Sequence, residues 1–114
     1  MTFSEILEKR IALYRRGSGG EIYDLYSVGS KFREFFPERD EFIKHFEKMH
    51  NEQVPVNIEV FRENHDDLCG EVLYIEVFQR GERAVKYYSK TQFVKEGGLW
   101  KISDEKREEQ YIKD

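Results

Sequence analysis

Three tyrosines and one tryptophan are the first candidates for chemistry in this sequence. Tyr14, Tyr26, Tyr87 and Trp100 fall where the surrounding apolar pattern turns side chains inward. A buried phenol donates a hydrogen bond to a ligand carbonyl or an oxyanion, so we expect these residues to line a ligand pocket. The alternative is that each ring packs in the core and each hydroxyl bonds backbone or water, which is common for buried tyrosine.

Asp24 is the acidic residue that could act as a general base. It lies one residue from Tyr23 and two from Tyr26, and burial would raise its pKa toward the range that proton abstraction needs. The alternative is a solvated carboxylate near the start of a helix, where the helix dipole favours negative charge. The sequence therefore assigns no catalytic residue.

The histidines and the single cysteine do not predict a metal site. His45 and His50 are five residues apart, whereas two ligands on one helix face need a spacing of three or four. The run 65–67, His-Asp-Asp, is explained by the polarity of a turn. Cys69 has no nearby histidine of predictable geometry, so we interpret it as a small half-buried hydrophobe. We expect no metal and no cofactor.

The segment 15–20, Arg-Arg-Gly-Ser-Gly-Gly, offers backbone amides that could cradle an anion. It lacks the Gly-Lys-Ser/Thr ending of a phosphate-binding loop and follows no predicted strand, so it is interpreted as a helix connector. The chain carries 19 Lys and Arg against 23 Asp and Glu, a net charge of -4, with no basic block. This balance argues against a nucleic-acid partner.

Length and composition predict one domain covering residues 1–114, with 39% apolar and 15% aromatic residues to form a core. Cys69 is the only cysteine, so no intrachain disulfide can form and a cytoplasmic location is expected. Residues 1–8 contain no apolar run typical of a secretory signal, and no segment resembles a membrane span.

The first half of the sequence predicts three helices. Thr2 and Glu5 have the spacing of a capping box, and apolar residues spaced three and four apart continue the first helix to about residue 16. Arg10 falls within this apolar stripe. A second helix is expected over about 21–36, ending before Pro37, and a third over about 38–50.

From Val54 onward the period changes to two, which predicts strands. We expect a first long strand from Val54, a second over 72–80, a third over about 83–95 and a fourth over 99–103. The tail from Asp104 to Glu109 is interpreted as too charged for the core, and as a solvated end or a short helix. Helices first and strands second indicate an α+β fold.

The two faces of the predicted sheet differ in composition. One face collects aliphatic residues including Ile58, Leu73, Ile75 and Val77, and we expect the helices to cover it. The opposite face carries an apolar patch among charged residues, and such a patch is typical of a homodimer interface. The expected interface residues are Phe61, Val72, Tyr74, Phe78 and Tyr88.

This order of elements, with the closing run 95–102, Lys-Glu-Gly-Gly-Leu-Trp-Lys-Ile, resembles the nuclear-transport-factor-two-like superfamily, also described as cystatin-like α+β. The resemblance covers nearly the whole chain. It implies a cone in which three N-terminal helices pack on a curved antiparallel sheet of three to four long strands, with a pocket open at one end. It also implies that the other sheet face often serves for dimerisation.

The superfamily includes ketosteroid isomerase, scytalone dehydratase, polyketide cyclases and plain binding modules, so function must come from the site. Members resembling ketosteroid isomerase place an acid among apolar pocket residues, whereas the face expected under the helices here supplies no carboxylate. We therefore expect a homodimeric module that binds a small apolar ligand. The alternatives are an isomerase, dehydratase or cyclase using tyrosine donors and an acidic base, or a cone filled by its own aromatic side chains.

Overall fold

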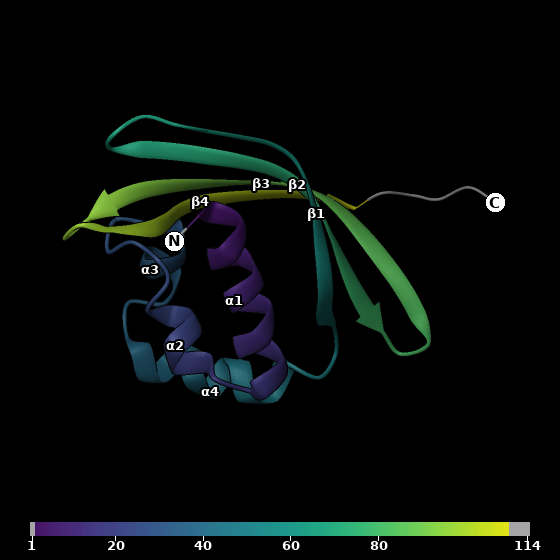
Figure 1. The fold of residues 1–114 in the computed structure, drawn as a ribbon. Helices are drawn as coiled ribbons and strands as arrows, with labels where there is room; N and C mark the ends of the chain where they lie inside the picture. The colour runs from purple at the N-terminus through teal and green to yellow at the C-terminus, as the bar shows by residue number, and fades with distance from the viewer. Residues whose placement is uncertain (1, 110–114) are drawn as a thin grey trace.

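A computed structural model describes residues 2–109 of the chain and places all four helices on the concave side of a bent sheet (Figure 1). The helices are α1 (Phe3–Arg16), α2 (Gly19–Tyr23), α3 (Lys31–Phe35) and α4 (Arg39–Met49). The strands are β1 (Val54–His65), β2 (Cys69–Arg80), β3 (Arg83–Glu96) and β4 (Leu99–Glu109). They form one antiparallel sheet in the order β1-β2-β3-β4, so the expected α+β class is confirmed.

The predicted limits of α1 are confirmed by its two caps. The Thr2 hydroxyl accepts a hydrogen bond from the Glu5 amide, and the Glu5 carboxylate reaches back to the Thr2 amide. Gly17 ends the helix with φ 77°, a left-handed conformation that glycine adopts at low cost. A helix connector follows Arg16, as predicted, but it covers only residues 17 and 18, because α2 already begins at Gly19.

The single helix predicted over 21–36 is wrong, because an irregular segment divides it into α2 and α3. In that segment Tyr26 forms a parallel bridge with Ile102 of β4. The Ser27 amide donates to the Ile102 carbonyl at 2.8 Å, and the Ile102 amide donates to the Leu25 carbonyl at 2.9 Å. Ser30 caps the new helix through its hydroxyl. Serine side chains compete with helical backbone bonds in this way, which periodicity alone does not reveal.

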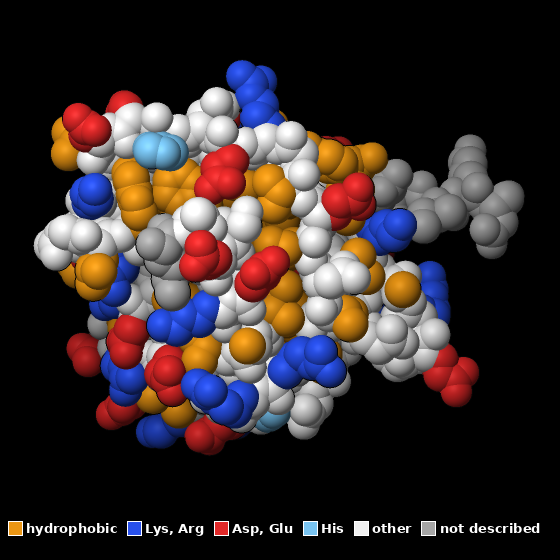
Figure 2. All heavy atoms as spheres, in the orientation of Figure 1, with side chains coloured by type: hydrophobic (Ala, Val, Ile, Leu, Met, Phe, Trp, Pro, Cys, Tyr) orange, Lys and Arg blue, Asp and Glu red, His pale blue; other side chains and the backbone are white. Residues whose placement is uncertain are grey.

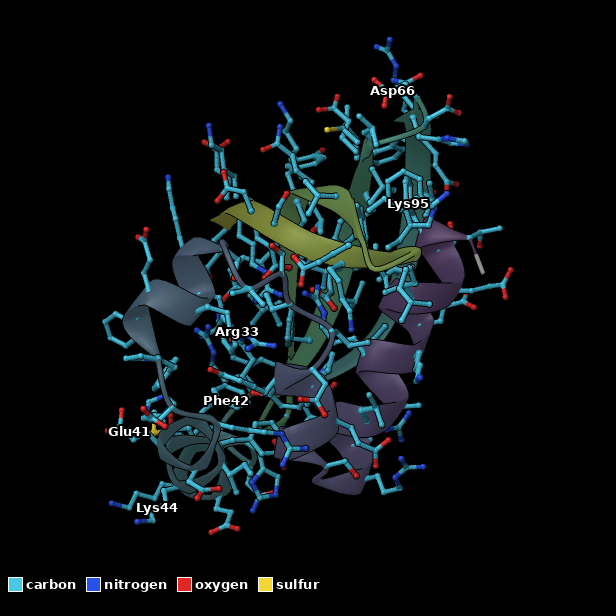
Figure 3. All side chains as sticks on the ribbon, turned by 90° about the vertical axis from the view of Figure 1, so that its left-hand side faces the viewer. Arg33, Glu41, Phe42, Lys44, Asp66 and Lys95 are labelled. Atoms are coloured by element: carbon cyan, nitrogen blue, oxygen red, sulfur yellow. The ribbon has the colours of Figure 1, made fainter. Side chains whose placement is uncertain are left out.

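The third helix and the strand starts agree more closely with the prediction. In α4, Phe42 points into the space below the sheet while Glu41 and Lys44 point outward (Figure 3). The change to strand at Val54 is confirmed, and β2 begins three residues earlier than expected. None of the helices within residues 2–109 is long and apolar enough to cross a membrane.

The expectation that the chain leaves the sheet after Ser103 is wrong. β4 continues to Glu109, and its last residues pair with the middle of β3, from Thr91↔Glu105 to Tyr87↔Glu109. Residues 104–109 are all charged, but charge does not end a strand when the side chains on one of its faces meet partners inside the protein. Glu105 and Arg107 lie on that face, as their contacts below show.

The assignment of the two faces of β2 is also wrong. Val72, Tyr74 and Phe78, expected in the dimer interface, are at most 4% exposed and lie under the helices. Leu73, Ile75 and Val77, expected under the helices, are only partly buried and alternate with them, so they lie on the outer face. Tyr74 and Glu76 made the covered face look polar in the sequence, and irregularities in β1 at 55–57 and 60–62 broke the alternation there.

The core lies between α1, α2, α4 and the sheet. Its fully buried members include Leu7 of α1, Val72 of β2, Phe93 of β3 and Ile102 of β4. Over the helical layer, basic and acidic side chains are interspersed without a large field of one sign (Figure 2). Between the sheet and its covering helices lies a space that side chains do not fill, and this space contains the candidate site.

Candidate functional site

A pocket of about 280 Å³ lies between the four helices and the sheet. Its walls are mainly aromatic and come from α1, α3, α4 and β2. The aromatic residues lining it include Tyr14, Phe32, Phe36, Phe42, Phe46 and Phe78. Its polar side is formed by four charged residues, Arg10, Glu76, Glu105 and Arg107. An apolar wall with a few convergent polar groups is the usual composition of a small-molecule site.

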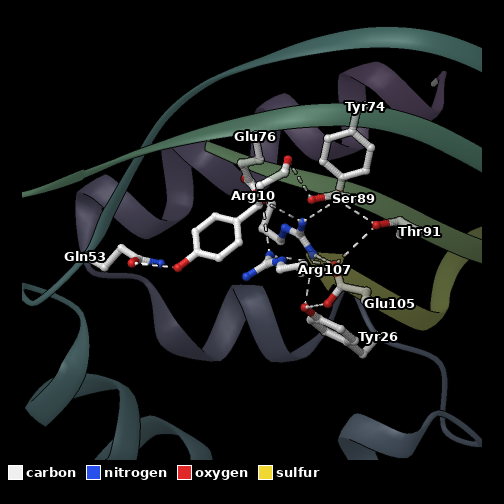
Figure 4. Close-up of polar contacts among 10 residues, drawn as sticks. Arg10, Tyr26, Gln53, Tyr74, Glu76, Ser89, Thr91, Glu105 and Arg107 are labelled. Carbon is white, nitrogen blue, oxygen red and sulfur yellow. Dashed lines mark hydrogen bonds and ion pairs between the residues drawn. The ribbon is translucent and has the colours of Figure 1, made fainter. Parts of the chain in front are cut away.

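Arg10 brings a positive charge from α1 into the core, where it is 4% exposed (Figure 4). Its Nη1 donates to the Tyr26 hydroxyl at 3.1 Å and to the Glu105 carboxylate. Its Nη2 donates to the Tyr74 hydroxyl at 3.2 Å and lies 3.7 Å from Glu76. A buried guanidinium requires such partners, because an unpaired charge in the interior is strongly destabilising.

Glu105 of β4 is the acidic centre of this cluster. It accepts hydrogen bonds from Arg10, from the Tyr26 hydroxyl at 2.7 Å and from the Thr91 hydroxyl at 3.3 Å. Burial by itself raises its pKa. The charges of Arg10 and Arg107, together with the hydrogen bonds from Arg10 and Tyr26, outweigh burial and lower the pKa to about 2. Glu105 is therefore ionised at neutral pH.

Glu76 and Arg107 complete the cluster. Glu76 of β2 is 1% exposed, and its Oε1 accepts a hydrogen bond from Arg107 Nη2 at 3.1 Å. The same nitrogen lies 3.9 Å from Glu105, and the Arg107 guanidinium lies 5.3 Å from the centre of the Phe78 ring. Two positive and two negative side chains thus meet in one place, and their formal charges cancel.

The tyrosines around the cluster remain protonated phenols. Burial raises the pKa of Tyr26, and the neighbouring Glu105 raises it further. Burial also raises the pKa of Tyr14, against the opposing effect of Arg107. Both hydroxyls can therefore donate hydrogen bonds at neutral pH, and neither supplies a phenolate nucleophile.

Two of the four predicted pocket residues line the pocket, and two do not. Tyr14 and Tyr26 are part of its wall. The hydroxyl of Tyr87 is held by Gln53 at 3.1 Å and Arg80 at 2.9 Å, outside the set of lining residues. Trp100 packs edge-on against Phe3 at 5.0 Å, also outside the pocket lining. The register that places Trp100 beside Lys95, at the end of β3, could not be read from the sequence.

The other candidates lie outside any catalytic arrangement. Asp24 forms a surface ion pair with Arg39 at 3.0 Å, in agreement with a solvated carboxylate. Cys69 is exposed, so its interpretation as half-buried is wrong. Within residues 2–109 no three acidic, histidine or cysteine side chains gather as a metal site would require.

The expectation that the covered sheet face lacks a carboxylate is wrong, because Glu76 and Glu105 both lie there. One signal in the sequence pointed to them. Arg10 falls in the apolar stripe of α1, and an arginine on a buried helix face needs an acidic partner. Which acids serve as partners depends on the register of β2, β3 and β4, in which Arg107 lies opposite Ser89, and Ser89 lies opposite Tyr74, two residues before Glu76.

The low pKa of Glu105 predicts a pH dependence of stability. Its folded value of about 2 lies below the reference of 4.5, so its stabilising effect is complete above about pH 4.5 and is lost as the pH falls toward 2. A shift of this size corresponds to about 3 kcal/mol. Glu105→Gln should remove this part of the acid destabilisation. It would be measured as the difference in free energy of unfolding by urea between pH 5.5 and pH 2.5.

Glu109→Gln provides the matched control, since Glu109 lies on the same strand and is exposed. That variant should keep the acid dependence of the wild type. An equal loss of stability between pH 5.5 and 2.5 in the wild type and in Glu105→Gln would contradict the proposed ionisation of Glu105.

No protein-family model and no curated protein matches this sequence. Solved structures do resemble it. An SEC-C motif containing protein from Rhodopseudomonas palustris has a TM-score of 0.73 at 20% identity, covering 92% of this chain and 77% of that one. A domain of unknown function with a cystatin-like fold from Nostoc punctiforme has a TM-score of 0.73 at 12% identity, covering 96% and 75%.

A third similar structure is a putative calcium/calmodulin dependent protein kinase II association domain from Xanthomonas campestris. Its TM-score is 0.61 at 16% identity, and the match covers 91% of this chain and 82% of that one. At these identities the likeness concerns the fold alone. The chain therefore has a cystatin-like α+β fold.

Proposed function

We propose that this chain is a homodimeric binding module that holds a small apolar molecule in the pocket between helices and sheet. The observation that carries the proposal is the unfilled space of about 280 Å³ behind an aromatic wall. An apolar cavity of about 150 Å³ accommodates benzene, so this space suits a molecule of about two fused rings. In the alternative of a filled cone, aromatic side chains such as Phe32, Phe36 and Phe42 would occupy this space, but they line its wall.

The charge cluster favours binding over acid–base catalysis. A general base works best with a pKa near the operating pH, whereas the pKa of Glu105 is about 2. Glu76 is paired with both Arg10 and Arg107. The two carboxylates of the pocket thus serve to neutralise arginines, and neither is a free base for the isomerase, dehydratase or cyclase alternative.

The outer face of the sheet supports the homodimer. Phe61 is 56% exposed and Tyr88 45% exposed, with ring centres 6.4 Å apart. Leu73, Ile75 and Val77 lie beside them on the same face. Four strands of about ten residues give the outer face an area of about 600 Å². This area approaches the roughly 800 Å² of surface that each partner buries in a stable interface. With Val72, Tyr74 and Phe78 buried, these five residues form the corrected interface.

The charges on this face are complementary to those of a second copy. One row across the sheet holds Glu59, Ile75, Tyr88 and Glu108, and the next holds Arg62, Leu73, Lys90 and Lys106. In a dimer whose two-fold axis lies between the two rows and perpendicular to the strands, the acidic row of each copy faces the basic row of the other copy. Acidic residues then meet basic ones at both edges, and Ile75 meets Leu73 in the centre.

Binding in the pocket is tested with naphthalene as a probe. Met49 lines the pocket and is 41% exposed at its edge, so Met49→Trp should occupy part of the space and weaken naphthalene binding at least about tenfold. Dissociation constants would come from amide chemical shifts in an NMR titration. Leu99→Trp, at an exposed site outside the pocket lining, is the control and should bind as the wild type does. The binding proposal fails if the wild type shows no saturable shifts.

The dimer is tested by charge exchange. Lys106→Glu should weaken dimerisation, because Glu108 of the second copy then faces a like charge, and the further change Glu108→Lys should restore it. Ile75→Glu should give a monomer by placing a charge at the centre of the interface. Sedimentation equilibrium at micromolar concentration gives the mass, with Val28→Glu, at an exposed site, as control. A monomeric wild type would refute the dimer.

A further inference from the structure

Arg107 is a charged residue of the pocket that keeps unused hydrogen-bond donors. A guanidinium carries five N–H groups. Among residues 2–109, Nη2 donates to Glu76, and no protein acceptor bonds Nη1 or Nε. The side chain is 37% exposed and lines the pocket. Arg10 differs, because it is almost fully buried and donates through both terminal nitrogens to Tyr26, Glu105 and Tyr74.

The charge balance of the cluster decides what kind of acceptor suits those donors. Arg10 and Arg107 are already matched by Glu76 and Glu105. A ligand carboxylate bonded to Arg107 would stand close to Glu76, which shares the same guanidinium at 3.1 Å. Two negative charges this close in a partly desolvated site repel each other. A neutral oxygen accepts the same hydrogen bonds without adding charge.

The walls of the pocket favour a flat ligand body. Phe32 stacks on Tyr26 with ring centres 3.9 Å apart, and Phe36 meets Phe42 edge-on at 5.3 Å. Aromatic rings gain most from offset stacking and edge contacts with other rings. The volume of about 280 Å³ limits the body to about two fused rings.

We infer that the pocket selects a flat, uncharged two-ring molecule with one oxygen acceptor, such as an aryl ketone, and that Arg107 donates a hydrogen bond to that oxygen. This inference rests on the proposed binding function and names its ligand class. Arg107 acts as a specificity-determining residue, while the aromatic wall supplies the binding that does not depend on the oxygen.

The test uses three probes of matched shape on the full chain: naphthalene, 2-acetylnaphthalene and 2-naphthoate. The ketone should bind about tenfold more tightly than naphthalene, as expected for one hydrogen bond from a charged donor. It should also bind more tightly than the carboxylate. The carbonyl ¹³C signal of labelled ketone should move downfield on binding, which reports the hydrogen bond itself.

Arg107→Met should abolish the preference for the ketone and the carbonyl shift, so that the ketone and naphthalene bind with equal affinity. Because this variant weakens the pairing of Glu76, Arg107→Lys is measured beside it, since its ammonium keeps the charge but lacks the planar fork that bonds Glu76 and the ligand oxygen at once. Arg15→Met, the same kind of change at an exposed arginine outside the pocket lining, is the control and should retain the preference.

The outcomes separate the two proposals. Equal binding of all three probes, or tightest binding of the carboxylate, overturns the inferred ligand class and leaves the pocket as a binding site. A ketone preference that survives in both Arg107 variants overturns the role of Arg107. Failure of all three probes to bind overturns the binding function itself, and the ligand class with it.

Discussion

Two carboxylates and two guanidinium groups meet in the interior of this protein, and the surrounding structure must keep them paired. Glu76 is almost fully buried, and Arg10 is 4% exposed. Each would be strongly destabilising without a partner of opposite charge. The pairing joins α1, β2 and β4, which are distant in sequence. It explains why β4 continues through a highly charged segment and why Arg107 stands beside the pocket.

The same cluster gives the pocket its chemical character. The four charges cancel and Glu105 is held ionised, so neither carboxylate on the polar side of the pocket is a free base, while Arg107 keeps hydrogen-bond donors there. The aromatic residues of α3 and α4 close the other side. The helices cover only one face of the sheet, so the strands present a second surface on which apolar side chains and charges of both signs alternate. The pocket therefore lies on one face of the sheet, and the proposed dimer interface lies on the other.

The sequence predicted the architecture but could not determine which side chains meet. The start of strand structure at Val54, the capping box at Thr2 and the buried Phe42 and Phe46 of α4 are local patterns, and each is found in the structure. Tyr14 and Tyr26 were recognised as pocket residues because they lie on apolar stripes. The faces of β2 were exchanged, because alternation defines two faces without saying which one the helices cover. Glu105 was missed because a charged strand and a charged tail have the same composition.

A double-mutant cycle between Arg10 and Glu105 tests the central claim most directly. The account predicts that Arg10→Met and Glu105→Gln each lower the free energy of unfolding by about 3 kcal/mol or more, since each leaves a buried charge without its partner. The double variant should lose little more than either single variant, which gives a coupling energy of about 3 kcal/mol. Additive effects, with a coupling below about 0.5 kcal/mol, would show that the pair behaves as an exposed one and would contradict the account.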